Sequence, residues 1–143
     1  MSKSSVLIVE DNDDIRIPLG ITLGNEGFTV FSARDCSSAF DFMAREQPDV
    51  ILTDLLMPEM TGLEFIRQLR RTAGYEEVPI IAMSAYDQSY LAAALLAGAN
   101  AALHKPEDLD NLVETIKETL RDTNNGNEMM PMSGMAAKNI SSD

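Results

Sequence analysis

The sequence predicts an α/β protein built on a doubly wound, five-stranded parallel sheet. Two observations support this prediction: five short apolar runs alternate with five segments of helical period, and polar residues directly follow most of the apolar runs. A helix between two strands returns the chain so that both strands are parallel, and such helices cover both faces of the sheet. With 143 residues, the chain is long enough for one domain with a full core.

The predicted strands are runs of apolar or β-branched residues bounded by turn residues. They occupy residues 6–9, 28–32, 50–53, 78–83 and 101–104. The predicted helices carry apolar residues three and four positions apart, and they span residues 15–25, 35–46, 61–72, 87–97 and 109–121. In the first helix Asp13 or Asp14 can act as the cap. Pro18 predicts a kink or a late start there, because proline removes a backbone hydrogen bond.

The C-terminal segment lacks the pattern of the rest of the chain. From Asp122 onward no apolar face repeats, and the Asn124-Asn125-Gly126 run is typical of a linker. We therefore expect one ordered domain over residues 1–121 and a disordered tail or linker over residues 122–143. A linker here would lead to a further domain outside this sequence.

Composition narrows the classes of function. The net charge is -12, from 11 basic and 23 acidic residues, so the surface repels phosphate backbones and direct nucleic-acid binding is not expected. No apolar run approaches the ~18 residues that span a bilayer, so no membrane association is expected. The single cysteine, Cys36, cannot form an intramolecular disulfide, which is typical of a reducing compartment. We expect a cytoplasmic protein.

The polar residues at the strand ends predict a site. The carboxyl ends of parallel strands meet at one edge of the sheet, and five polar residues fall there: Glu10, Asp11, Asp54, Ser84 and Lys105. Three carboxylates close together repel unless a cation neutralises them, and Mg²⁺ prefers such oxygen ligands. Beside Mg²⁺, a lysine and a hydroxyl group, Asp54 is equipped to attack phosphorus and form an aspartyl phosphate.

These residues resemble the receiver domain of two-component response regulators. The matching motifs are Glu10-Asp11, Asp54 with Met57-Pro58-x-x-x-Gly62, Ser84-Ala85 and Lys105-Pro106, and they cover about residues 5 to 121. The resemblance implies a flavodoxin-like (βα)5 receiver fold with strand order 2-1-3-4-5 and a receiver domain within residues 1–121.

The resemblance also implies roles for the site residues. Asp54 would be the phosphoacceptor, and Ser84 and Lys105 would contact the phosphoryl group. The metal would be held by the side chains of Asp11 and Asp54, by the Leu56 carbonyl and, through water, by Glu10. Receivers of this kind take the phosphoryl group from a histidine kinase or a histidine phosphotransfer protein. They then bind a downstream effector protein differently, and they catalyse only their own phosphorylation and dephosphorylation.

Glu10 and Ala102 depart from the usual receiver pattern. Glu10 stands where the family frequently has aspartate, a change that should preserve metal binding. Ala102 stands where the family has an aromatic residue that rotates on activation, so the usual coupling between the hydroxyl group and the aromatic ring is not expected. Tyr86 or Tyr90 could take the place of that ring, but packing at the surface accounts for these tyrosines more simply. Leu56 and Tyr86 occupy the positions that flank the phosphoryl group in this family. Because both side chains are bulky and limit access of water, we expect slow self-dephosphorylation.

Other functions fit the residues less well. A dehalogenase-type phosphatase needs a second acid two residues after its nucleophile, where this chain has Leu56. A flavodoxin-like cofactor binder needs a phosphate-binding loop after the first strand, where the acids at residues 10–14 repel phosphate. The alternative is a phosphate-independent pseudo-receiver that acts as a protein-interaction module. Ala102 favours it, whereas the acidic triad with Ser84 and Lys105 argues against it.

Overall fold

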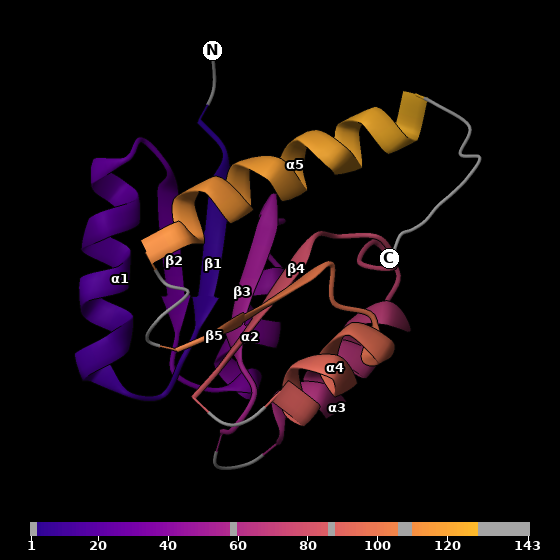
Figure 1. The fold of residues 1–143 in the computed structure, drawn as a ribbon, viewed down its shortest axis with the longest axis horizontal. Helices are drawn as coiled ribbons and strands as arrows, with labels where there is room; N and C mark the ends of the chain where they lie inside the picture. Colours follow the sequence, from indigo (N-terminus) through magenta and orange to yellow (C-terminus); the bar gives the residue numbers. More distant parts are fainter. Residues whose placement is uncertain (1–2, 58–59, 86–87, 106–109, 129–143) are drawn as a thin grey trace.

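The computed structural model describes residues 3–57, 60–85, 88–105 and 110–128. They form a parallel sheet with strand order β2-β1-β3-β4-β5, which confirms the predicted fold class and strand order (Figure 1). The strands are β1 (Ser5–Val9), β2 (Thr29–Ala33), β3 (Val50–Asp54), β4 (Ile80–Ser84) and β5 (Ala101–His104). The helices described are α1 (Asp13–Asn25), α2 (Cys36–Met43), α3 (Gly62–Arg70), α4 (Gln88–Ala97) and α5 (Leu112–Glu128).

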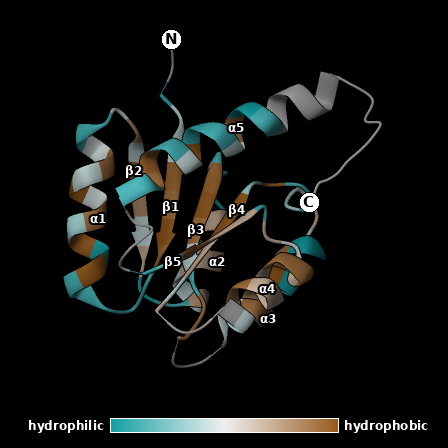
Figure 2. Ribbon diagram, in the orientation of Figure 1, coloured by the Kyte–Doolittle hydropathy of each residue, from teal (hydrophilic) through white to brown (hydrophobic). Residues whose placement is uncertain are grey.

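The sheet lies between two layers of helices. Helices α1 and α5 cover one face, and α2, α3 and α4 cover the other (Figure 1). Successive side chains of a strand point to opposite faces, so Leu7 and Val9 pack toward α2 and α3 while Val6 and Ile8 pack toward α1 and α5. The central strands are therefore buried on both faces and largely apolar, as Figure 2 shows for β1 and β3.

The strand register aligns the carboxyl ends of the strands. Val9 pairs with Ala33 on β2 and with Thr53 on β3, and Asp54 pairs with Met83 on β4. Backbone hydrogen bonds continue just past the strands, since the Lys105 amide donates to the carbonyl of the last β4 residue at 2.7 Å. The residues that follow or end these strands therefore share one edge of the sheet.

The first helix begins earlier than predicted. The Asn12 side chain accepts a hydrogen bond from the Asp14 amide at 2.9 Å and caps α1, so the predicted caps Asp13 and Asp14 lie inside the helix. The late start predicted from Pro18 is wrong, because α1 begins at Asp13 and contains Pro18. Proline costs the helix one backbone hydrogen bond, and the Asn12 cap and the buried Leu19 and Leu23 offset that loss.

The last helix is longer than predicted. Helix α5 runs to Glu128, so residues 122–128 are helical and the helix passes its predicted end at Arg121. Once a helix is nucleated, each added residue forms a further hydrogen bond at little cost, and no proline interrupts the sequence before Pro131. The predicted start at Leu109 and residues 129–143 lie outside the described residues.

Within the described part of the chain, every helix is too short or too polar to cross a membrane.

Arg70, at the end of α3, joins segments that are distant in sequence. Its guanidinium donates to the Gly98 carbonyl from Nε at 3.1 Å and from Nη2 at 2.8 Å, and to the carbonyls of Tyr75 at 3.1 Å and Val78 at 2.8 Å. Nη2 also donates to Asn100 Oδ1 at 3.1 Å. Burial lowers the pKa of Arg70. This guanidinium therefore holds the loop before β5 against the end of α3.

Replacing Arg70 should destabilise the fold. We expect Arg70→Ala to lower the free energy of unfolding by about 3 kcal/mol, because it leaves several carbonyl groups without their charged donor. Arg45→Ala is the matched control, since exposed Arg45 donates only to the Asp41 carbonyl among the contacts described, and it should cost less than about 0.5 kcal/mol. Urea unfolding measures both values. Equal effects of the two substitutions would contradict this role of Arg70.

Candidate functional site

Three acids meet at the carboxyl edge of the sheet. Glu10 follows β1 and is 1% exposed, and Asp54 ends β3 and is 8% exposed, whereas Asp11 is open to solvent. One carboxylate oxygen from each lies within 4.8 Å of the others. The predicted convergence of Glu10, Asp11 and Asp54 is therefore present in the fold, in an arrangement that could hold a metal ion.

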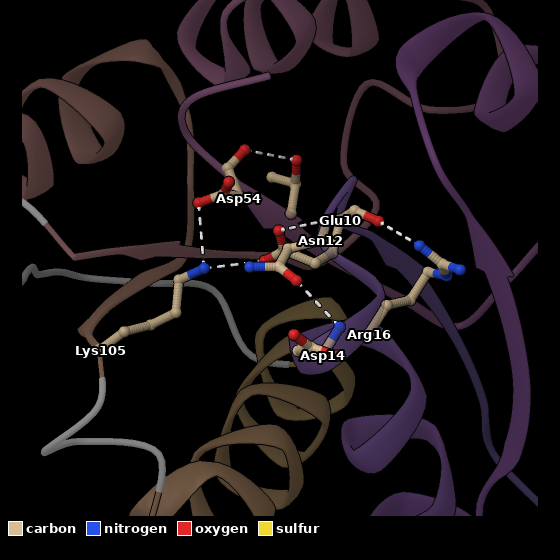
Figure 3. Close-up of polar contacts among 7 residues, drawn as sticks. Glu10, Asn12, Asp14, Arg16, Asp54 and Lys105 are labelled. Carbon is tan, nitrogen blue, oxygen red and sulfur yellow. Dashed lines mark hydrogen bonds and ion pairs between the residues drawn. The ribbon is translucent and has the colours of Figure 1, made fainter. Parts of the chain in front are cut away.

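Lys105 joins the two buried acids. Its Nζ lies 2.8 Å from Glu10 Oε1 and 3.3 Å from Asp54 Oδ1, and the lysine is 7% exposed (Figure 3). Among the described contacts, one ammonium group thus opposes three carboxylates. This leaves an excess of negative charge that a divalent cation with oxygen ligands would balance, so the residues fit Mg²⁺.

Burial sets the proton affinity of both acids. Desolvation raises the pKa of Glu10 and of Asp54, and the hydrogen bond or charge of Lys105 opposes this effect without overcoming it. For each carboxylate, the loss of water therefore outweighs the gain from one lysine. A second cation at this edge would favour the ionised forms, which a nucleophilic carboxylate requires.

Two further residues brace the loop between β1 and α1. The backbone N–H of Asn12 donates to Glu10 Oε2 at 3.2 Å, and Arg16 Nη1 donates to the Glu10 carbonyl at 3.0 Å. Arg16 Nη2 also pairs with Asp13 Oδ1 at 2.6 Å. Arg16 is not among the site residues predicted from the sequence, because an arginine in the first turns of a helix is ordinarily a solvated residue. Its only signal in the sequence was proximity to four acids.

The remaining predicted site residues lie at the same edge. Ser84 ends β4 and is 1% exposed, and Leu56 is half-buried in the loop after β3. Ala102 is half-buried against the core cluster that includes residues of α4. Its side chain is a methyl group, so there is no aromatic ring at this position that could rotate. Tyr90, one of its suggested substitutes, is 37% exposed on α4. The other, Tyr86, lies outside the described residues.

Gly62 permits the sharp return of the chain beneath Asp54. The Gly62 amide donates to the Leu55 carbonyl at 2.8 Å, which closes the loop at the start of α3. A Cβ atom at Gly62 would lie 2.3 Å from the Asp54 carbonyl oxygen and 2.6 Å from Leu55 Cα. Only glycine therefore fits, and the Met57-Pro58-x-x-x-Gly62 spacing has a steric basis at its last position.

Comparisons with known proteins agree with this geometry. A family model of the response regulator receiver domain matches residues 6–117. Response regulator MprA of Mycolicibacterium vanbaalenii is 37% identical over 119 residues, which are 82% of this chain and 51% of MprA. A putative response regulator from Chloroflexus aurantiacus has a similar structure, with a TM-score of 0.80, 28% identity, and coverage of 84% of this chain and 99% of that one. Chemotaxis protein CheY4 of Vibrio cholerae has a TM-score of 0.76 and 29% identity, covering 82% of this chain and 99% of CheY4.

The edge of the sheet that carries Glu10, Asp11 and Asp54 is called the acidic edge below. Together with the fold and the family match, it defines a receiver domain. The chain belongs to the response regulator receiver domain family of two-component systems. It spans about half the length of the MprA proteins that it matches. The resemblance inferred from the strand-end residues is thereby confirmed.

An added methyl group at Gly62 should disturb both the fold and the site. We expect Gly62→Ala to lower the free energy of unfolding by about 2 kcal/mol, because the Asp54 carbonyl and Leu55 must move. Gly24→Ala is the matched control, since its Cβ meets nothing within 4 Å and alanine favours the helix. Chemical unfolding measures both. A neutral effect at Gly62 would show that the backbone contact is not restrictive.

Asp54→Asn should stabilise the protein, and more so as the pH rises. Because burial raises the folded-state pKa of Asp54 above its usual 3.8, ionisation favours the unfolded chain. The contribution of Asp54 to folding is therefore complete below pH 3.8 and is lost as the pH rises through the folded-state pKa. Asparagine does not ionise, so the advantage of the variant should grow as the pH rises through the folded-state pKa of Asp54. Thermal unfolding with a chelator measures it.

Asp35→Asn provides a control of opposite sign. The Ser38 amide lowers the pKa of exposed Asp35, so its charge stabilises the folded chain at higher pH. The Asp35 variant should lose stability relative to wild type as the pH rises. An Asp54 variant that behaves in the same way would contradict the account of the buried acids.

Proposed function

We propose that the chain is a phosphoacceptor that takes a phosphoryl group onto Asp54 and signals through altered protein binding. The observation that supports this most is the position of the Lys105 ammonium between Glu10 and Asp54, at 2.8 and 3.3 Å. A buried cation beside a strand-end carboxylate is suited to a nucleophile that must accept a highly charged group. The family match supports the same reading.

The chemistry is an in-line transfer from a phosphohistidine. A carboxylate oxygen of Asp54 forms a bond to phosphorus while the bond from phosphorus to the imidazole nitrogen breaks. The imidazole nitrogen keeps the electron pair and takes a proton, and Asp54 becomes an acyl phosphate. Lys105 offers its charge to a phosphoryl oxygen, and Ser84 offers its hydroxyl group to another.

Mg²⁺ is the cofactor that the acidic edge would take. Glu10, Asp11 and Asp54 supply carboxylates, and Leu56 supplies a backbone carbonyl in the loop after β3. When bound, the ion would supply positive charge beside the incoming phosphoryl group. Binding of the ion would neutralise part of the negative charge of these acids. They would then hold the Lys105 ammonium group less strongly, and that group could pair with a phosphoryl oxygen.

The partners follow from this chemistry. A histidine kinase or a histidine phosphotransfer protein supplies the phosphoryl group, and α1 with the loops around Asp54 forms the surface that meets it. A downstream effector protein responds to the phosphorylated state, as the loop after Ser84 and α4 shift between two arrangements. The chain acts in the cytoplasm. It is not an enzyme toward other substrates, since it catalyses only its own phosphorylation and dephosphorylation.

Intact mass spectrometry tests the proposal. After incubation with a small-molecule phosphodonor, wild type should gain one phosphoryl group with Mg²⁺ and none with a chelator. Asp54→Asn should gain none under either condition. Asp35→Asn is the matched control and should gain the phosphoryl group as wild type does, because it removes an acid at the start of α2 and asparagine can also cap a helix.

The same measurement followed over time tests the stability of the adduct. We expect slow decay, because Leu56 and Tyr86 occupy the two sequence positions that in this family flank the phosphoryl group, and bulky residues there limit access of water. Leu56→Asn should speed the decay several-fold. Rapid loss from wild type would contradict this expectation, and no adduct from folded protein would favour a phosphate-independent pseudo-receiver.

A further inference from the structure

We propose that Arg16 is a positioning residue for the metal ligands Glu10 and Asp11. Its guanidinium fixes the loop between β1 and α1 so that these two acids face Asp54 before a cation binds. This inference rests on the proposed function, because it concerns the Mg²⁺ site of that function. Arg16 lies outside the acidic edge, and its replacement should change the affinity of the site for Mg²⁺.

The two donations of Arg16 go to the two ends of the loop. Nη1 donates to the Glu10 carbonyl at 3.0 Å, and Nη2 donates to Asp13 Oδ1 at 2.6 Å. The Arg16 side chain is only 10% exposed, although its partner Asp13 is 54% exposed. A planar guanidinium can make both donations at once in a fixed geometry, which an ammonium cannot. Arg16 therefore spans the loop instead of merely neutralising it.

Glu10 is held from both sides as a result. Arg16 donates to its main-chain carbonyl, while the backbone N–H of Asn12 at 3.2 Å and Lys105 Nζ at 2.8 Å donate to the two oxygens of its carboxylate. Figure 3 shows Arg16 and Lys105 on either side of Glu10. Asp11 lies between the anchored residues, so its backbone has little freedom although its side chain is exposed. The loop is thus arranged before the cation arrives, which lowers the cost of binding.

Electrostatics alone predicts the opposite effect of removing Arg16. A positive charge beside the acids repels a cation, so a variant without the guanidinium would bind Mg²⁺ more tightly if charge alone mattered. A variant that keeps the charge would then bind as wild type does. Positioning predicts weaker binding for both variants. The sign of the change therefore distinguishes the two roles.

The test compares Arg16→Lys, Arg16→Ala and wild type by thermal unfolding at increasing Mg²⁺ concentrations. The rise in Tm with concentration gives the Mg²⁺ dissociation constant, and the Tm with a chelator gives the stability of the fold itself. We expect Arg16→Lys to raise the dissociation constant about tenfold, as found when residues that orient metal ligands are replaced. Arg45→Lys is the matched control, because exposed Arg45 donates to a backbone carbonyl in α2, and it should leave the constant unchanged.

The outcomes separate this inference from the function on which it rests. A wild-type Tm that does not respond to Mg²⁺ would overturn both. A wild-type response that Arg16→Lys retains in full would overturn the positioning role alone, as would tighter binding by Arg16→Ala. Amide hydrogen exchange without metal gives a second readout, because faster exchange of residues 11–14 in Arg16→Lys is expected and unchanged exchange would contradict the proposal.

Discussion

Two carboxylates buried against one ammonium group are the interaction on which this structure depends. Glu10 and Asp54 come from different strands, and Lys105 reaches both from a position 95 residues after Glu10. Lys105 stabilises both buried carboxylates, but it does not fully offset the cost of their burial, because the pKa of each remains raised. Such a site is most stable when a further cation or a proton arrives. The incomplete charge balance makes the edge of the sheet receptive to a metal ion.

The architecture concentrates this charge at one place and isolates it from the core. Parallel register brings the ends of β1, β3, β4 and β5 to one edge, where buried apolar residues are followed by the polar or charged residues Glu10, Asp54, Ser84 and Lys105. Gly62 lets the loop after Asp54 turn back tightly, and Arg70 holds the opposite end of α3. The buried charged side chains are therefore attached to a backbone that close packing at Gly62 and the hydrogen bonds of Arg70 hold in place. This suits a site in which the charge of the side chains changes.

The sequence predicted the fold class, the strands and the convergence at the sheet edge because each depends on short-range pattern and on the geometry of parallel sheets. The predicted bounds of two helices were wrong, because local side-chain contacts and tertiary packing outweighed the usual preferences of single residues. Asn12 capped α1 ahead of the acids, Pro18 was accepted within the helix, and α5 continued through Asn124 and Gly126. Arg16 was missed for a different reason: its role depends on which carbonyl its guanidinium reaches, and no periodicity records that.

We infer that the acids at this edge bind a divalent cation because their charge is incompletely balanced. The most direct measurement is a Mg²⁺ titration of isotope-labelled protein, followed by amide resonances in ¹H–¹⁵N spectra. The account predicts saturable shifts of residues 10–12, 54–57, 84–85 and 105, which follow or end the four strands at the site. Absence of saturable shifts there, or shifts confined to exposed acids such as Glu114 and Glu118 on α5, would contradict it.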